Sequence, residues 1–192
     1  MWSLYALLLI ISRAEGGPWY KGWLLSGKCP DPDVQEAFDI NKYLGIWYEI
    51  AKNPTIFQTG RCTQATYSLK SNGKMDVQHE EILSDGTVRK AESEAYPSQG
   101  VGADPAKMRI SYFWLAPSAP YWVLSTDYDN YALVYSCLYF PFHVHTEYLW
   151  ILSRKRQLSP DIMQQLNETL KSNNINVDNL KVSDQSMCSD DL

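Results

Sequence analysis

The chain has 192 residues, of which 45% are hydrophobic and 20% charged, and its formal net charge at pH 7 is −5. This composition is typical of a single globular domain and not of a disordered chain. The acidic balance argues against nucleic acid as a partner, because phosphate binding needs a basic face. With 7 Trp, 13 Tyr and 5 Phe the chain has more aromatic side chains than its core needs, so we expect some of them to line a ligand site.

The first residues are predicted to be a secretion signal. The apolar run from Trp2 to Ile11 is too short to span a bilayer, and Ser12 and Ala14 after it have the small side chains that a signal peptidase prefers. We place the signal at residues 1–14, with cleavage as late as about residue 26 as an alternative. No basic residue precedes the apolar run, which leaves a poorly defined amino terminus as a second alternative. We expect a secreted, extracellular protein.

A single domain is predicted over residues 29–188, followed by a tail at 189–192. Its first part is an entry segment, in which Phe38 and Tyr43 are expected to lie in a short helical turn. Gly45 then ends that turn and leads into the first strand.

Short β-rich runs separated by turn residues follow one another after Gly45. The turns at 71–73, 84–86 and 127–130 contain Gly or Asn, which accept the positive φ of tight hairpins. Connections this short leave no room for helical crossovers, so the sheet is expected to be antiparallel. The predicted strands span residues 46–52, 63–70, 74–82, 87–96, 106–115, 120–127, 131–138 and 145–153.

One helix is predicted after the last strand. Ser159 is a good N-cap and Pro160 suits the first helical position. Ile162, Leu166 and Leu170 then recur every four residues and form one apolar stripe. The stripe indicates that this helix packs on the outside of the sheet, against a last strand that is apolar on both faces.

Eight antiparallel strands can close on themselves, which removes the exposed edges of the sheet. The predicted fold is therefore an all-β, eight-stranded up-and-down barrel with one carboxy-terminal helix outside it. The interior of such a barrel is wide enough for packed side chains or for one small ligand. A sandwich of two sheets is the alternative.

Three motifs carry a resemblance to a known family. Gly45 and Trp47 form a Gly-x-Trp motif at the first strand, Thr126-Asp127-Tyr128 lies between the sixth and seventh strands, and Arg154 follows the last strand. In this order, and with a helix after the third, the motifs are specific: the chain resembles the lipocalins. Further segments resemble one branch of that family, at residues 27–30, 117–122 and 131–137.

The residue types suggest a structural role for the motifs. Gly45 lets the chain turn closely into the barrel, and Trp47 can plug its closed end. Arg154 can lie over the indole, a cation–π contact worth about 0.5–2 kcal/mol, and can donate to free carbonyls there.

The four cysteines allow three pairings. The resemblance implies Cys29–Cys137 and Cys62–Cys188, which would tie both terminal segments to the barrel. No thiol would then remain for catalysis.

Strand alternation nominates the wall of a ligand site, because the apolar face of each strand points inward. The resemblance implies a small lipophilic ligand: a fatty acid, steroid, retinoid or bilin. No cofactor is expected. The alternative is that the aromatic residues only fill space. The candidate contact residues are Tyr67, Tyr112, Trp114, Trp122, Leu124 and Trp150.

The loop at residues 138–142 is apolar where loops are usually polar. Tyr139, Phe140 and Phe142 could contact a lipoprotein particle, a membrane surface or a partner protein. The alternative is that this loop folds onto the amino-terminal segment through Cys137.

Two further signals concern modification and metals. Asn167 begins an Asn-Glu-Thr acceptor sequence on the predicted helix, and we expect glycosylation there. His143 and His145 would share a strand face but lack an evident third ligand, so no metal site is expected.

Binding and transport of a small hydrophobic ligand is the predicted function, and we expect a monomer that is not an enzyme. The alternative is a secreted interaction or signalling protein with a filled barrel, which acts through the loop at 138–142. The few lipocalins that isomerise lipids need a free nucleophilic thiol, and the pairing that the resemblance implies would leave none.

Overall fold

The computed structural model describes residues 24–189, except for 56, 99–102 and 112–116. The element bounds agree closely with the predicted strands, although the end of the fifth predicted strand lies outside the described residues. The strands of the main sheet are β2 (Gly45–Lys52), β3 (Arg61–Leu69), β4 (Met75–Ile82), β5 (Val88–Pro97), β6 (Lys107–Ser111), β7 (Ala119–Thr126), β8 (Tyr131–Phe140) and β9 (Val144–Ser153).

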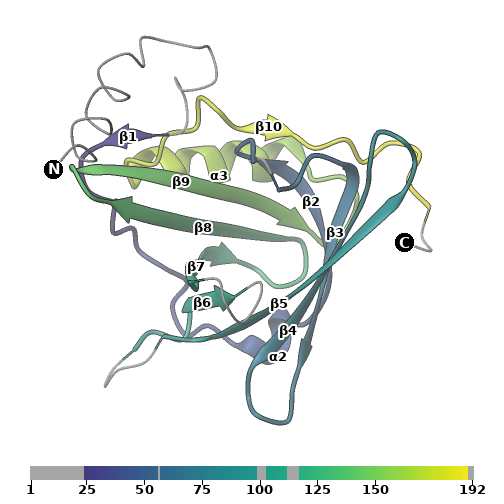
Figure 1. Ribbon diagram of the computed structural model, residues 1–192, viewed down its shortest axis with the longest axis horizontal. Coiled ribbons are helices and arrows are strands. Elements are labelled where there is room, and N and C mark those ends of the chain that lie inside the picture. The colour runs from purple at the N-terminus through teal and green to yellow at the C-terminus, as the bar shows by residue number, and fades with distance from the viewer. Residues whose placement is uncertain (1–23, 56, 99–102, 112–116, 190–192) are drawn as a thin grey trace, which may run out of the picture.

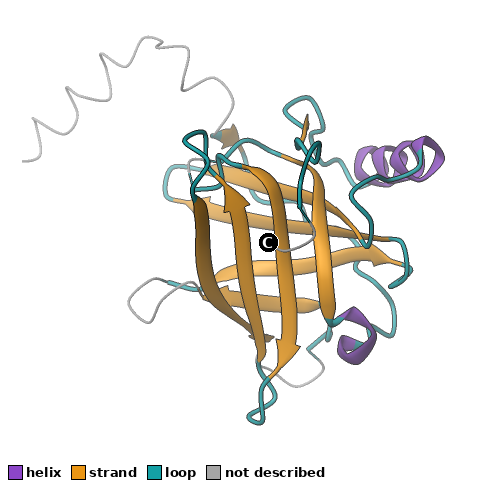
Figure 2. Cartoon of the chain, turned by 90° about the vertical axis from the view of Figure 1, so that its right-hand side faces the viewer, coloured by secondary structure: helices purple, strands orange, loops and turns teal. Residues whose placement is uncertain are grey.

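These eight strands form a closed antiparallel barrel. Each pairs with the next along the chain, and β9 pairs back with β2, where Tyr48 lies opposite Ser153. Figure 2 shows the strands wrapping around a common interior, with the helices outside. The predicted barrel is confirmed, and the two-sheet sandwich is wrong.

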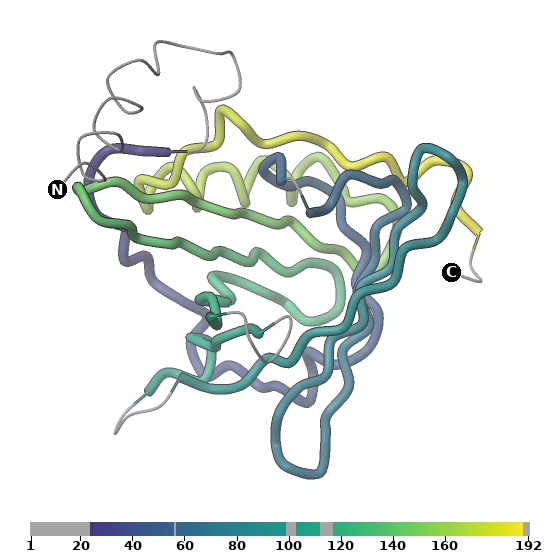
Figure 3. The backbone as a smooth tube through the Cα atoms, viewed as in Figure 1, coloured from purple at the N-terminus to yellow at the C-terminus, as the bar shows by residue number. Residues whose placement is uncertain are grey.

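Two short strands, which the sequence did not predict, extend the sheet. The strand β1 (Leu25–Ser26) pairs with the start of β9, and β10 (Lys181–Val182) pairs with the end of β2. Figure 3 follows the segment that contains β10, in yellow, along the barrel toward the carboxy terminus. Both ends of the domain therefore lie against the barrel wall.

Apolar side chains form two clusters, one on each side of the wall. Alternation along β8 separates them, because Val134 points into the barrel while Leu133 and Tyr135 point outward. The outer cluster receives Leu166 and Leu170 from the helix α3 (Pro160–Ser172). This explains why the last strands are apolar on both faces.

The helices are short. The predicted caps of α3 are confirmed: Ser159 Oγ accepts a hydrogen bond from the Ile162 amide, and Pro160 is the first residue. The helix α2 (Ile40–Tyr43) is the turn expected before the barrel (Figure 1). Within the described part of the chain, neither helix has the length and apolar character that crossing a membrane requires.

Trp47 and Arg154 seal one end of the barrel. The indole of Trp47 is fully buried and donates to the Tyr43 carbonyl at 2.8 Å, and the Arg154 guanidinium lies 3.7 Å from the ring centroid. Gly45 has φ +98°, and a Cβ there would lie 3.3 Å from Arg154 Nη1. Glycine therefore serves both the turn and the close approach of the guanidinium.

The guanidinium of Arg154 joins three segments of chain. It donates to carbonyls before and within β2, at Leu44 (2.9 Å) and Ile46 (2.9 Å), and to Tyr128 O in the turn between β7 and β8 (2.9 Å). One side chain thus binds carbonyls of several segments at the closed end. The guanidinium thus makes the contacts expected of this motif, over the indole and to carbonyls at the closed end.

The second motif builds the turn between β7 and β8. Asp127 Oδ1 accepts from the Asn130 amide at 2.8 Å and the Tyr131 amide at 3.0 Å. Thr126 Oγ1 donates to Tyr131 O at 2.6 Å and accepts from the Tyr128 amide. Tyr128 has φ +68°, so these bonds stabilise a backbone conformation that is unfavourable for tyrosine.

Two disulfides fasten the terminal segments, as the resemblance implied. Cys29 is bonded to Cys137 in β8, and Cys188 is bonded to Cys62 in β3. Each closes a loop of more than a hundred residues, for which the chain-entropy model gives a stabilisation of about 4–5 kcal/mol.

We predict that Arg154→Met lowers the free energy of unfolding by about 3 kcal/mol, because carbonyls at the closed end lose a charged donor. Urea unfolding followed by tryptophan fluorescence would measure this. Lys155→Met removes a positive charge from the next, exposed residue and should change stability by less than about 0.5 kcal/mol. Equal stability of the two variants would contradict the role given to Arg154.

Candidate functional site

A cavity of about 210 Å³ lies inside the barrel, between the closed end and the loop 53–60 that follows β2. Its wall is mainly apolar and aromatic, and six polar side chains interrupt it. The apolar and aromatic lining residues are Trp47, Phe57, Ala65, Tyr67, Ile110, Pro117, Ala119, Pro120, Tyr121, Val134, Leu138, Tyr148, Trp150 and Leu152. The polar ones are Glu49, Gln58, Thr63, Gln64, His79 and Ser136.

Three tyrosines form a hydrogen-bonded group at the closed end of this cavity. The Tyr121 hydroxyl lies 2.9 Å from the hydroxyls of both Tyr43 and Tyr67. Burial raises the pKa of Tyr43 and of Tyr121 well above the ordinary value, so these two hydroxyls stay neutral. Tyr67 and Tyr121 are the members of the group that line the cavity.

Two of the predicted contact residues line the cavity. Tyr67 and Trp150 lie in its wall, on the inward faces of β3 and β9. That they touch a ligand stays a prediction. Tyr112 and Trp114 lie outside the described residues.

Trp122 and Leu124 require a correction, because both lie outside the barrel. They belong to the outer cluster, where the Trp122 ring is 6.4 Å from that of Tyr135 and Lys107 Nζ lies 4.3 Å from the indole centroid. Tyr121 lines the cavity in their place. The sequence could not separate the two faces, since β7 is apolar on both. The pairing with β8 does separate them: Trp122 lies opposite Tyr135, which points outward, so Trp122 lies on the outer side of the wall as well.

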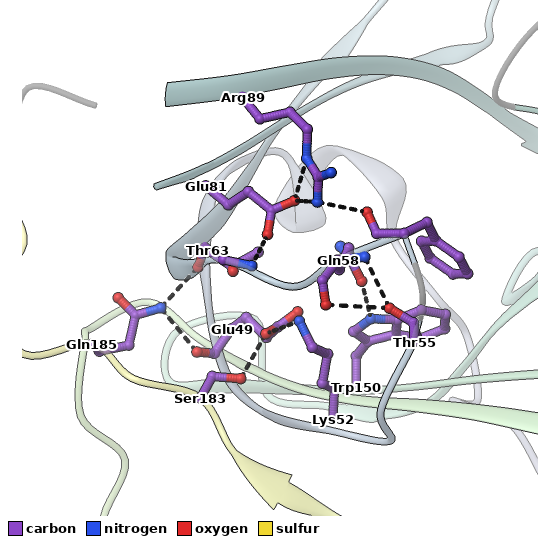
Figure 4. A network of polar contacts seen from close by, with 12 residues as sticks. Glu49, Lys52, Thr55, Gln58, Thr63, Glu81, Arg89, Trp150, Ser183 and Gln185 are labelled. Atoms are coloured by element: carbon purple, nitrogen blue, oxygen red, sulfur yellow. Dashed lines mark hydrogen bonds and ion pairs between the residues drawn. The ribbon is translucent and has the colours of Figure 1, made fainter. Parts of the chain in front are cut away.

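The loop 53–60 was not predicted as part of the site, yet it closes over the end of the barrel opposite Trp47. Trp150 Nε1 donates to Gln58 Oε1 at 3.0 Å, and the Phe57 ring lies 5.8 Å from that of Tyr148. Figure 4 shows Gln58 above Trp150. The length of the segment between two strands was its only signal in the sequence.

An ion pair on neighbouring strands holds this loop. Arg89 in β5 binds the Glu81 carboxylate in β4 and donates to the Phe57 carbonyl at 3.0 Å. The same carboxylate accepts from the Gly60 amide (Figure 4). Two side chains of the barrel thus bind the loop backbone at two points.

His79 is the titratable base in the cavity wall. Its Nε2 lies 3.2 Å from Ser93 Oγ, and loss of solvent lowers its pKa from 6.5 to about 4, partly opposed by the charge of Glu81. His79 lines the cavity and is only partly exposed. At neutral pH the imidazole is therefore uncharged.

Comparison with known proteins agrees with this architecture. A family model described as "Lipocalin-like domain" matches residues 38–185. The chain belongs to the lipocalin family. The branch that its three further segments resemble is apolipoprotein D: the chain is 52% identical to apolipoprotein D of Macaca fascicularis over 185 residues, which cover 96% of this chain and 94% of the relative. It is 47% identical to that of Bos taurus over 189 residues, or 98% and 96% of the two chains.

A solved structure extends the likeness to an insect protein. The structure of insecticyanin from Manduca sexta superimposes with a TM-score of 0.74 at 28% identity, over 86% of this chain and 90% of the other. The barrel and its carboxy-terminal helix are therefore the lipocalin fold.

The other predicted sites of this lipocalin lie outside the cavity. Asn167 is half-buried in the middle of α3. His143 and His145 have separate partners, the Tyr139 hydroxyl and the Gly27 carbonyl. Over the part of the chain that the structure describes, no three His, Cys, Asp or Glu side chains gather as metal ligands.

The apolar segment at 138–142 is partly strand and partly turn, since β8 continues to Phe140. The amino-terminal segment does pair with this hairpin, through β1 and the Cys29–Cys137 disulfide. It leaves the aromatic side chains uncovered, however: Phe142 is 89% exposed, Tyr139 49% and Phe140 39%.

We predict that Arg89→Met speeds hydrogen exchange of the amides in residues 53–60 by about tenfold, because the loop loses a charged donor. Exchange measured by mass spectrometry would show it. Lys90→Met is the matched control, since Lys90 is exposed and forms its ion pair with Glu80 instead of Glu81. Equal exchange in both variants would contradict the role of Arg89.

A second prediction concerns pH. Because the pKa of His79 is about 4 in the folded chain and 6.5 is its ordinary value, the unfolded chain binds more protons between these values. His79 therefore lowers the free energy of unfolding as the pH falls from 6.5 to 4, by at most about 3 kcal/mol. Urea unfolding at several pH values should show a smaller decline in His79→Gln. His143→Gln, which changes an exposed histidine, should keep the wild-type decline, and identical curves for all three proteins would refute the assignment.

Proposed function

We propose that this lipocalin binds a small hydrophobic molecule inside its barrel and carries it outside the cell. The observation that carries the proposal is the cavity itself, which is sheltered by a closed sheet and lined mainly by apolar and aromatic side chains. Such a cavity favours a lipophilic ligand, because binding removes the apolar surface of both the ligand and the cavity wall from water.

The cysteines support a protein that binds its ligand without catalysis. All four are used in two disulfides, so none offers a nucleophilic thiol. We infer a carrier and not an enzyme.

Secretion is supported by the same disulfides, which persist in oxidising compartments. The predicted signal at residues 1–14 lies outside the described residues. We also propose that Asn167 carries a glycan and that the protein is a monomer.

The exposed aromatic side chains at the tip of β8 favour a second candidate. Tyr139, Phe140 and Phe142 could attach the protein to a lipoprotein particle, a membrane surface or a partner. A protein that acts only through this surface would have a filled barrel and would bind no lipophile.

We predict that Trp150→Leu weakens the binding of retinol by about tenfold or more, because the ligand loses contact with a large aromatic face. Isothermal titration would measure the dissociation constant. Trp122→Leu makes the same substitution on the outer side of the wall, so it should lower stability but change the affinity by less than about twofold. An equal loss of affinity in the two variants would contradict the placement of the site, and absence of binding by any lipophile would favour the second candidate.

A further inference from the structure

The cavity has one polar corner, where β2 and β3 part. Tyr48 and Gln64 form the last pair of that ladder, and Glu49 and Thr63 are the next residues of the two strands. Gln185 bridges the gap, since its Nε2 donates to the Glu49 carbonyl at 2.9 Å and the Thr63 carbonyl at 2.8 Å. Figure 4 shows this bridge and the two residues on either side of it.

One carboxylate oxygen of Glu49 has polar partners, and the other has none among the described residues. Its Oε1 lies 2.8 Å from Lys52 Nζ and accepts from Ser183 Oγ at 2.6 Å. Its Oε2 has no hydrogen-bond partner among the described residues, although the residue is only 2% exposed. Buried carboxylate oxygens are rarely left in this state in native proteins.

The side chain of Thr63 also has a buried oxygen without a hydrogen-bond partner in the described structure. Its Oγ1 is buried and has no hydrogen-bond partner in the described part of the chain, and the residue is 3% exposed. Both Glu49 and Thr63 line the cavity. A group that satisfies the two oxygens can therefore approach them from inside the barrel.

The charge of the cavity limits the chemical class of the ligand group that can bind these two oxygens. Glu49 is the one charged side chain among the described lining residues, and Lys52, its partner, is not among them. His79 is uncharged because burial lowers its pKa to about 4. Residues 56, 99–102 and 112–116 include no charged residue. A ligand carboxylate would thus find a like charge and no free cation.

A hydroxyl group matches the hydrogen-bonding capacity of both open oxygens. It can donate to a carboxylate oxygen such as Glu49 Oε2 and can accept from a threonine hydroxyl such as that of Thr63, since it is both donor and acceptor. A carbonyl can only accept, and an ionised carboxylate can only accept and is repelled.

We propose that the cavity selects a neutral lipophile that carries a hydroxyl group, which Glu49 and Thr63 bind, over the corresponding carboxylate. The proposal rests on the proposed function, because it names the ligand class of the same cavity.

Three retinoids test this selectivity, since retinol, retinal and retinoic acid share one hydrocarbon and differ in the head group. Titrated into the full chain at neutral pH, retinol should bind at least about tenfold more tightly than retinoic acid, with retinal between them. Equal affinities, or tighter binding of retinoic acid, would overturn the proposal and leave lipophile binding intact. If none of the three binds, the proposed function fails with it.

Variants assign the effect to the two residues. Thr63→Val keeps the shape of the side chain and should weaken retinol binding by about fivefold or more, with less than about a twofold change for retinoic acid. Thr146→Val is the matched control, because Thr146 is a buried threonine of β9 that is not a lining residue. It should leave both affinities within about twofold of the wild type.

The charge is tested with the double variant Glu49→Gln/Lys52→Met, which removes both members of the ion pair and leaves no buried charge alone. The preference for retinol over retinoic acid should fall below about threefold. An unchanged preference in this variant would overturn the proposal, with circular dichroism showing that the variant is folded. If it does not fold, the Thr63→Val result decides.

Discussion

The pairing of β9 with β2 is the constraint on which the rest of this structure depends. Without it the eight strands would form an open sheet with two edges and no sheltered interior. Arg154 follows β9 and Trp47 lies in β2, so the contact of the guanidinium with the indole joins the two strands that close the barrel. The motif that identifies the family therefore also holds together the two strands that close the barrel.

The two ends of the barrel are built in different ways. At the closed end, Trp47 and the guanidinium of Arg154 occupy the space and satisfy the free carbonyls. At the other end, the loop 53–60 is bound by hydrogen bonds from Trp150 and Arg89 and to the carboxylate of Glu81. The closed end is thus filled by side chains of the barrel motif, whereas the other end is covered by a loop that hydrogen bonds attach to the strands.

The carboxy-terminal segment has a part in the chemistry of the cavity as well as in stability. The Cys62–Cys188 disulfide ties it to β3, and Ser183 and Gln185 then reach the backbone and side chain of Glu49. The Ser183 hydroxyl holds one carboxylate oxygen of Glu49, while the other has no hydrogen-bond partner among the described residues. The Cys62–Cys188 disulfide, which joins residues far apart in the sequence, thus helps to form the polar corner of the cavity.

The sequence by itself determined the order and limits of the strands, the capped helix and the structural motif at Gly45, Trp47 and Arg154. These features depend on neighbours in the chain: alternation, turn residues and caps act over a few positions. The resemblance to known lipocalins supplied the disulfide pairing, which spacing alone left open.

Only the tertiary structure decided which side of the wall each aromatic residue takes and which polar groups are left open. On β7 both faces are apolar, because α3 and the entry segment cover the outside, so alternation could not tell Trp122 from Tyr121. The two-residue strands β1 and β10 are too short to leave a pattern. Glu49, Thr63 and Gln185 meet only because the closed barrel and the Cys62–Cys188 disulfide bring segments more than a hundred residues apart into contact.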